Sequence, residues 1–328
     1  MFTQARFTQA RFANMIPLTT LIRLTGLCLA GCAALTAPAW GQVRKLHTRD
    51  MTRLSQVQVA DYLKRSDIIF IPIGAVETNG IMPSDRDYTY PLGVSIAMAE
   101  ELDALYMPGL PWSYPGTTMI AEATVNLSPT QGVEFLRATA LSLLKQGFRR
   151  QVYISMSQGP APLTGGTLAR EFYDTEHVPI LYIDMDMYLP KLKLAADARS
   201  KLMYGTHHIA GRIIDIPCKG DYAEGMALPS GPVPENTGLA GLNKLGYAGS
   251  LTLGSWQSDV MSHGGGREPA LPANPEEREQ WGKEGEAQLR AIVKQMHLAE
   301  AMEDLRKHDQ YTNQILMPKF GKLVPKSH

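Results

Sequence analysis

The chain has little that could cross-link it or bind it to nucleic acid. It carries three cysteines in 328 residues, and two of them, Cys28 and Cys32, lie in the N-terminal segment. Without those two, Cys218 has no partner for an internal disulfide, and its expected role is that of a buried structural thiol. The formal net charge is zero, from 32 basic and 32 acidic residues, so no nucleic-acid surface is predicted.

A long hydrophobic run is also missing. The apolar stretch LTGLCLAGCAALT follows Arg23 and is too short to span a bilayer comfortably. Ala37-Pro38-Ala39 supplies an A-x-A cleavage site, so residues 1–39 are predicted to be a secretory signal peptide. Leu29-Ala30-Gly31-Cys32 also resembles a bacterial lipobox. We therefore expect a periplasmic or secreted protein that meets the membrane only if Cys32 is lipidated.

No low-complexity linker divides the rest of the chain, and strand and helix patterns alternate along it. Predicted strands cover 68–73, 151–156 and 179–184, and predicted helices cover 56–64, 94–105, 129–147, 167–176, 189–203 and a long segment from 275. Residues 205–272, rich in Gly and Pro, are expected to form loops with short strands. The pattern predicts one α/β domain over 45–306, three-layered, with a mainly parallel sheet flanked by helices, and a C-terminal tail over 307–328 that wraps the surface.

Ligands of such folds bind beyond the carboxyl ends of the strands. The first strand, Ile68 to Ile73, runs into a loop that carries Glu77, Asp85 and Asp87 but no histidine. One interpretation is a metal site or a general base that acts on water. The structural alternative is a loop in which Glu77 caps backbone N–H groups and Asp87 pairs with Arg86 or Arg53.

Four segments of the chain resemble the creatininase (creatinine amidohydrolase) family. IPIGAVETNG resembles the family's first strand and turn, and YPGT at 114–117 matches its F-P-G-T. LSPTQGVEFLRATALSLLKQGFRRQVYIS follows its helix and second strand, and ANPEEREQWGKEGEAQL resembles a late helix start. The resemblance implies a hydrolase with the creatininase fold that binds a small-molecule substrate and forms a homo-oligomer.

The family's usual site is a pair of divalent metals held by Glu, His and Asp side chains. Its Glu falls on Glu77, its bridging Asp on Asp87 with Asp85 as the alternative, and its two motif histidines on Asn79 and Ser157. The resemblance thus implies an oxygen-rich donor set, which suits Mg²⁺, Ca²⁺ or Mn²⁺ better than Zn²⁺. We expect either one divalent ion, Mn, Mg, Ca or Zn, or no metal.

Further candidates surround the predicted site. His207 and His208 are treated as neighbours on an extended chain, so at most one of them reaches the site, and His208 is taken as a general base or replacement ligand. Ser157 is a candidate nucleophile, because the sequence around it resembles the G-x-S-x-G nucleophile elbow. In the alternative interpretation, Ser157 is a small polar residue that occupies the space of the family's lost metal ligand. Asn79, Trp112, Tyr114 and His263 are candidate substrate contacts, with Tyr88 and Tyr90 in nearby loops. Asp184 and Asp186 end the third strand and are expected to cap a helix.

Three functions remain open at this point. The first is a periplasmic hydrolase that cleaves a C–N bond of a small cyclic amide or related compound, with Glu77 and Asp87 binding a metal or activating water and His208 shuttling a proton. The second is a non-catalytic protein that binds a small ligand on a decayed enzyme fold. The third is a metal-free lyase or isomerase with Glu77 or Asp87 as its base.

Overall fold

A computed structural model describes residues 46–77, 79–109, 123–125, 127–156, 166–192, 194, 196–222 and 270–323, with the backbone alone for residues 196–200. These residues belong to one compact unit that starts at Leu46. The predicted signal peptide and the candidates Ser157, Trp112, Tyr114 and His263 lie outside them. Every helix in the described ranges is too short or too polar to cross a membrane.

The described strands form one four-stranded parallel sheet in the order β2-β1-β3-β4. Its strands are β1 (Ile68–Pro72), β2 (Leu105–Tyr106), β3 (Arg150–Ser155) and β4 (Leu181–Asp184). Phe70 pairs with Val152, and Val152 pairs in turn with Leu181. All five residues of β1 are buried, as a strand covered on both faces requires. The predicted α/β fold with a parallel sheet is confirmed.

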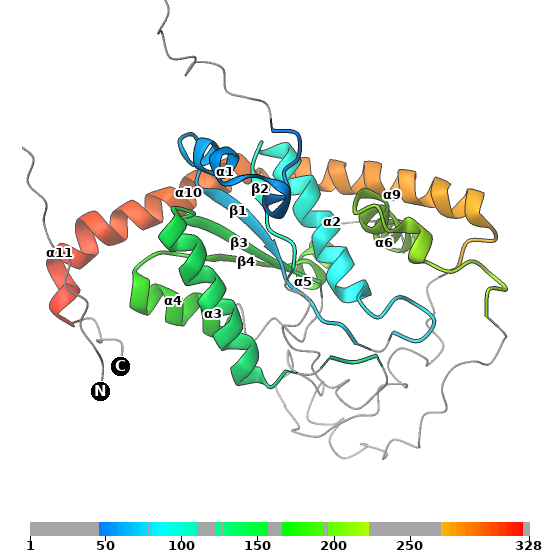
Figure 1. Ribbon diagram of the computed structural model, residues 1–328, viewed down its shortest axis with the longest axis horizontal. Helices are drawn as coiled ribbons and strands as arrows, with labels where there is room; N and C mark the ends of the chain where they lie inside the picture. The colour runs from blue at the N-terminus through cyan, green and yellow to red at the C-terminus, as the bar shows by residue number, and fades with distance from the viewer. Residues whose placement is uncertain are drawn as a thin grey trace, which may run out of the picture. The chain divides into compact units, whose positions relative to one another are not determined.

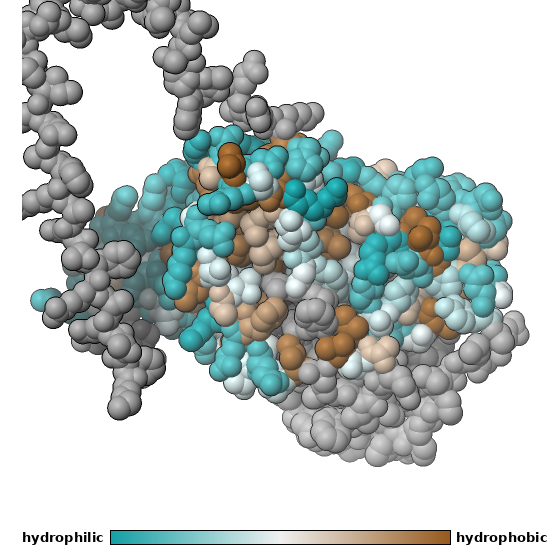
Figure 2. Space-filling model, in the orientation of Figure 1, coloured by the Kyte–Doolittle hydropathy of each residue, from teal (hydrophilic) through white to brown (hydrophobic). Residues whose placement is uncertain are grey.

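Helices cover both faces of this sheet, which makes three layers (Figure 1). One face packs against α2 (Arg86–Glu101), α6 (Ala196–Ile209), α9 (Pro275–Gln295) and α10 (Leu298–Tyr311). The other face packs against α1 (Gln56–Leu63), α3 (Pro129–Gln146) and α4 (Ala169–Glu176). Alternate strand residues enter the two cores: Phe70 and Ile154 the first, Ile69 and Tyr153 the second. The outward face of α9 is mostly hydrophilic (Figure 2).

Helix α3 shows why local sequence predicts some boundaries well. Ser128 accepts a hydrogen bond from the backbone of Gln131, whose side chain reaches back to the Ser128 backbone, and Pro129 occupies the first turn. Gly147 ends the helix at a φ of 110°. Both ends lie where the sequence predicts them, because every signal involved is within three residues of the boundary.

Glycines bring α6 unusually close to its neighbours. A Cβ at Gly285 of α9 would overlap the carbonyl oxygen of Lys201, and one at Gly205 would overlap the Gly285 backbone. A Cβ at Gly93 of α2 would likewise overlap Thr206. Helix α6 is therefore held between α2 and α9. These two contacts fix the position of the C-terminal end of α6 beside the loop after β1.

Several boundaries differ from those predicted. Helix α2 begins at Arg86 instead of residue 94, in spite of Pro91, because burial of Tyr88, Thr89 and Tyr90 outweighs weak local helix propensity. The predicted helix from 189 is a short turn followed by α6, which continues to Ile209 into a region expected to be loops. The predicted tail is helical: α10 runs to Tyr311, and a π turn (Thr312–Leu316) and α11 (Met317–Phe320) follow. Further short helical turns lie at Met51–Arg53, Met185–Tyr188 (α5), Leu189–Lys191, Ile213–Asp215 and Gly321–Leu323.

Candidate active site at the carboxyl edge of the sheet

The loop after β1 is closed by its own backbone. Gly74 lies so near the backbone of Asp87 and Tyr88 that a Cβ there would overlap both. The Glu77 N–H donates to the carbonyl of Ser84 at 2.8 Å, which joins the two ends of the loop. Glu77 is only 4% exposed, so its carboxyl group is held in a largely water-free position at the edge of the sheet. A carboxyl group in this setting can accept a proton from a bound water.

Asn79 offers a buried acceptor beside this loop. Its Nδ2 donates to the carbonyls of Glu77 at 3.3 Å and Ser84 at 3.4 Å. Because both neighbours can only accept, the NH₂ group must face them, and Oδ1 faces away. Oδ1 is buried and has no hydrogen-bond partner among the residues that the structure describes. A buried acceptor without a partner is uncommon in native proteins and marks a place for a donor from a ligand or water.

The two aspartates of the loop are ion-paired. Asp85 forms a salt bridge with Arg212, which follows α6 and also donates to Thr89 Oγ1 at 3.3 Å. Asp87 lies in the first turn of α2, with Arg86 Nε 3.3 Å from its Oδ1. The structural alternative for Asp87, a pair with Arg86, is therefore present. The expectation that Asp87, Tyr88 and Tyr90 lie in a loop is wrong, because α2 contains all three.

His207 is the histidine of α6 that faces this group of charges. It is 1% exposed, and its Nδ1 lies 3.0 Å from the Met203 carbonyl oxygen. Since that oxygen can only accept, Nδ1 carries the proton and Nε2 keeps its lone pair. Nε2 is buried, and no described residue offers it a hydrogen bond. Burial lowers the pKa of His207 from 6.5 to about 4, against the opposing effect of Asp85, so the imidazole is neutral near pH 7.

His208 has a different position from the one expected of a general base. Its Nδ1 lies 2.6 Å from Glu286 Oε2, and its Nε2 lies 3.3 Å from Glu279 Oε1. Both partners belong to α9. The reasoning that treated His207 and His208 as neighbours on an extended chain fails because both residues lie in α6, where successive side chains diverge by about 100°. The helix turns His207, not His208, towards Asp85.

The other strand ends carry polar groups with structural partners. Ser155, the last residue of β3, shares a 2.5 Å hydrogen bond with the Tyr182 hydroxyl. Asp184 accepts from the backbone N–H groups of Asp186 and Met187 at 2.9 and 3.2 Å, so it caps α5 as expected. Burial raises the pKa of Asp184. Cys218 is buried, as predicted for a structural thiol.

We tested whether the described donors fit the divalent metal that the resemblance implies. Among the residues that the structure describes, no three His, Cys, Asp or Glu side chains are grouped so as to hold a metal ion. Asp85 and Asp87 are engaged by arginines instead of facing a shared point. This part of the site does not fit a metal ion, so no chemical step is derived through one.

Sequence reasoning missed Arg212 and ranked His208 above His207. The Asp85–Arg212 pair joins residues separated by 127 positions, and no local sequence pattern predicts such a pair. A signal for His207 does exist. Met203 and Tyr204 precede it by four and three positions, so helical spacing places His207 on a face with two large apolar residues, and all three are buried.

Comparisons with known proteins agree with the motifs. Residues 52–207 match the family model Creatininase, described as creatinine amidohydrolase. No curated protein matches the chain. Among solved structures, the chain is similar to a creatinine amidohydrolase (creatininase) with 14% identity over 76% of this chain and 98% of that one, at a TM-score of 0.47. It is also similar to a structure described as creatininase Mn (15% identity, 76% and 98% covered, TM-score 0.46) and to a putative creatinine amidohydrolase from Bacteroides fragilis (16%, 75% and 95%, 0.49).

The site defined by these observations is an acidic loop beyond the first strand of a parallel α/β sheet. Two buried acceptors, Asn79 Oδ1 in this loop and His207 Nε2 on α6, have no partner among the described residues. The family match begins before β1 and ends at His207, so it contains the loop, α2 and all four strands. Residues 52–207 match the creatininase family model, so the resemblance that the sequence motifs carry is confirmed over this part of the chain.

Proposed function

We propose that this protein is a hydrolase of the creatininase family that cleaves a C–N bond in a small cyclic amide or related compound. The observation that carries the proposal is the position of Glu77. In the motif resemblance it falls on the family's glutamate, and it lies within the matched region and is buried at the carboxyl edge of β1. A carboxyl group in that position is suited to act as the general base for attack by water.

The neighbouring acceptors support a ligand rich in N–H donors. Asn79 Oδ1 and His207 Nε2 are both buried and have no partner within the described ranges of the chain, and both can only accept a hydrogen bond in the states described above. Ring and exocyclic N–H groups of a small cyclic amide would supply the missing donors. A ligand without such donors would leave these acceptors unsatisfied, at a cost of about 1–3 kcal/mol each.

In the proposed step, Glu77 accepts a proton from water as the water oxygen bonds to the ring carbonyl carbon. The C–N bond then breaks, and its electron pair stays on nitrogen, which takes up the proton that Glu77 had accepted. The products are a carboxyl group and an amine on one open chain. The neutral imidazole of His207 binds and orients a donor of the substrate and needs no change of protonation.

Two finer properties belong to the same proposal. The divalent ion that the family resemblance implies, Mn, Mg, Ca or Zn, is not one of them, because Asp85 and Asp87 are engaged by arginines. Export to the periplasm is supported by the sequence features of residues 1–39. Assembly into a homo-oligomer rests on the family resemblance alone.

A second function, binding without catalysis, is favoured by one observation. Asp85 and Asp87 are both paired with arginines, and such pairs are also what a site that has lost its chemistry retains. Ligand contact at Asn79 and His207 would then raise the melting temperature without turnover.

The experiment is a turnover assay with creatinine, hydantoin and dihydrouracil, read by chromatography of the ring-opened products. Glu77→Gln keeps the size of the side chain but removes the base, so the rate should fall by about 10²-fold or more. The matched control is Glu101→Gln, on the exposed end of α2, which should leave the rate unchanged. Equal rates in both variants would rule out Glu77 as the base, and ligand-induced stabilisation with no product would establish the binding protein instead.

A further inference from the structure

The C-terminal helical segment leaves large apolar side chains in water. Ile315 is 53% exposed, Phe320 44% and Leu323 80%, and Tyr311, one turn before Ile315, is 51% exposed. Tyr311 lines a separate hollow with Asp304, Lys307 and His308, whereas Phe320 and Leu323 lie together beside α4. Gathered exposed apolar side chains of this kind mark an interaction surface more often than scattered ones do.

The same segment carries charge of one sign. The last acidic residue of the chain is Asp309, and Lys319 and Lys322 follow it with no carboxylate among the residues after them. Both lysines are exposed, and the Lys319 ammonium lies 5.0 Å from the centre of the Phe320 ring. Lysines interleaved with exposed aromatic and aliphatic residues are typical of elements that lie on an anionic membrane surface.

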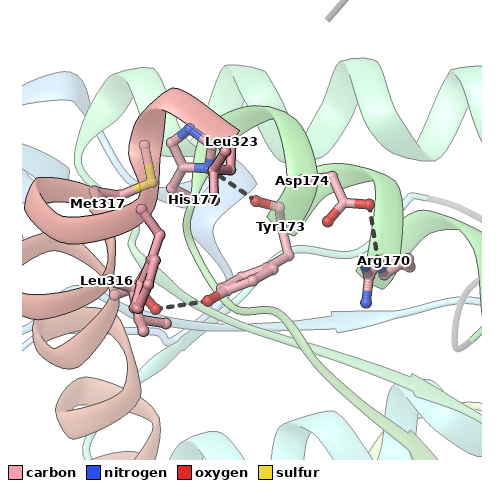
Figure 3. Close-up of a pocket in the computed structure, with 9 residues that line it drawn as sticks. Arg170, Tyr173, Asp174, His177, Leu316, Met317 and Leu323 are labelled. Carbon is pink, nitrogen blue, oxygen red and sulfur yellow. Dashed lines mark hydrogen bonds and ion pairs between the residues drawn. The ribbon is translucent and has the colours of Figure 1, made fainter. Parts of the chain in front are cut away.

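A pocket of about 280 Å³ adjoins these residues, between α4 and the C-terminal turns (Figure 3). Leu316, Met317, Phe320 and Leu323 supply its apolar wall, and Tyr173 stands opposite them. The Tyr173 hydroxyl shares a hydrogen bond with Thr312 Oγ1 at 2.9 Å. The polar group on the Tyr173 side of the pocket is therefore hydrogen-bonded. Arg170 and His177 lie at the border of the pocket, where Arg170 is paired with Asp174 at 2.8 Å.

From this combination we infer that the surface formed by residues 315–323 docks on anionic lipid, with Phe320 and Leu323 entering the acyl region and Lys319 and Lys322 contacting the headgroups. The pocket beside α4 offers space for part of one acyl chain. A second copy of the chain fits less well. In a two-fold contact this surface would meet the same segment of a second copy, which offers its lysines no Asp or Glu side chain. Anionic headgroups provide the opposite charge.

The test is co-sedimentation of residues 40–328, which retain the whole compact unit, with vesicles. Vesicles of phosphatidylcholine alone are compared with vesicles that also contain phosphatidylglycerol. We expect binding to the anionic vesicles only, weakened by added salt. The Phe320→Ser/Leu323→Ser protein should lose it, and the Lys319→Glu/Lys322→Glu protein should show a fall in partition coefficient of at least about tenfold.

Matched controls separate this surface from general effects. Val57→Ser removes an equally exposed apolar side chain from α1, and Lys145→Glu/Lys294→Glu makes the same change of charge on other helices. Both should bind anionic vesicles as the parent does. Equal binding to both kinds of vesicle, or equal loss in test and control proteins, would overturn the inference. So would sedimentation velocity showing a dimer that the Phe320→Ser/Leu323→Ser change dissociates while no vesicles are bound.

Discussion

Acid should destabilise this protein through His207 in particular. The folded chain holds the imidazole buried and neutral, with a pKa of about 4 against an ordinary 6.5. Below about pH 6.5 the unfolded chain binds a proton that the folded chain does not accept, so the free energy of unfolding falls as the pH falls. The loss is complete near the folded pKa of about 4. At about 1.4 kcal/mol per pH unit, it amounts to roughly 3 kcal/mol.

The perturbation that isolates this effect is His207→Asn. Asparagine can still donate to the Met203 carbonyl, but it does not titrate. The variant should be less stable than the parent near pH 7 because it leaves a small cavity. Its additional loss between about pH 6.5 and 4 should be smaller than the parent's by about 3 kcal/mol.

Urea denaturation, followed by fluorescence at several pH values, measures both proteins. His297→Asn is the control, because His297 is 71% exposed and sits at a φ of 49°, which asparagine tolerates. The control should keep the full acid sensitivity of the parent. If His207→Asn and the parent lose equal stability over this pH range, the assignment of a buried neutral imidazole is refuted.

Three further predictions concern the framework around the site. Gly285→Ala should destabilise the fold by at least about 2 kcal/mol in urea denaturation, since its Cβ overlaps the α6 backbone. Gly166→Ala is the control, because a Cβ at Gly166 meets open space, and it should cause no such loss. Equal effects of the two substitutions would disprove the close contact between α6 and α9. Ser128→Ala should cost about 1 kcal/mol in the same assay by removing the α3 cap, and no loss would show that the cap is dispensable. Arg149→Gln breaks a two-bonded ion pair with Asp309 and should speed amide hydrogen exchange in α10 but not in α3; unchanged exchange would contradict its anchoring role.

Helix boundaries could be predicted where the residues that set them are close in sequence, and could not be predicted where packing against a distant segment sets them. The two ends of α3 are set by Ser128 and Gly147 within the helix itself, and both were predicted. The start of α2 is set by packing, because Gly74 of the preceding loop lies against the backbone of its first turn. Pro91 and Gly93 make the segment look like a loop when only neighbouring residues are considered.

The candidate site divides in the same way. Glu77 and Asn79 could be proposed from the sequence because they follow β1 directly. Glu77 falls on the glutamate of a family motif, and Asn79 replaces the histidine of that motif. The choice between His207 and His208 depends on the rotation of α6, which is fixed by contacts with α9, where Glu279 and Glu286 engage His208. Arg212 could not be found, since its partner Asp85 is 127 residues away and a lone arginine in a loop has many other uses.

The most direct test of hydrolysis is the origin of the oxygen in the product. The protein is incubated with creatinine and the other cyclic amides in water enriched in heavy oxygen, and the products are weighed by mass spectrometry. The account predicts a ring-opened product that carries one solvent oxygen in its new carboxyl group, absent with Glu77→Gln. A product without solvent oxygen would indicate a lyase or isomerase, and a bound but unchanged ligand would show that the site only binds; either result would contradict the proposed function.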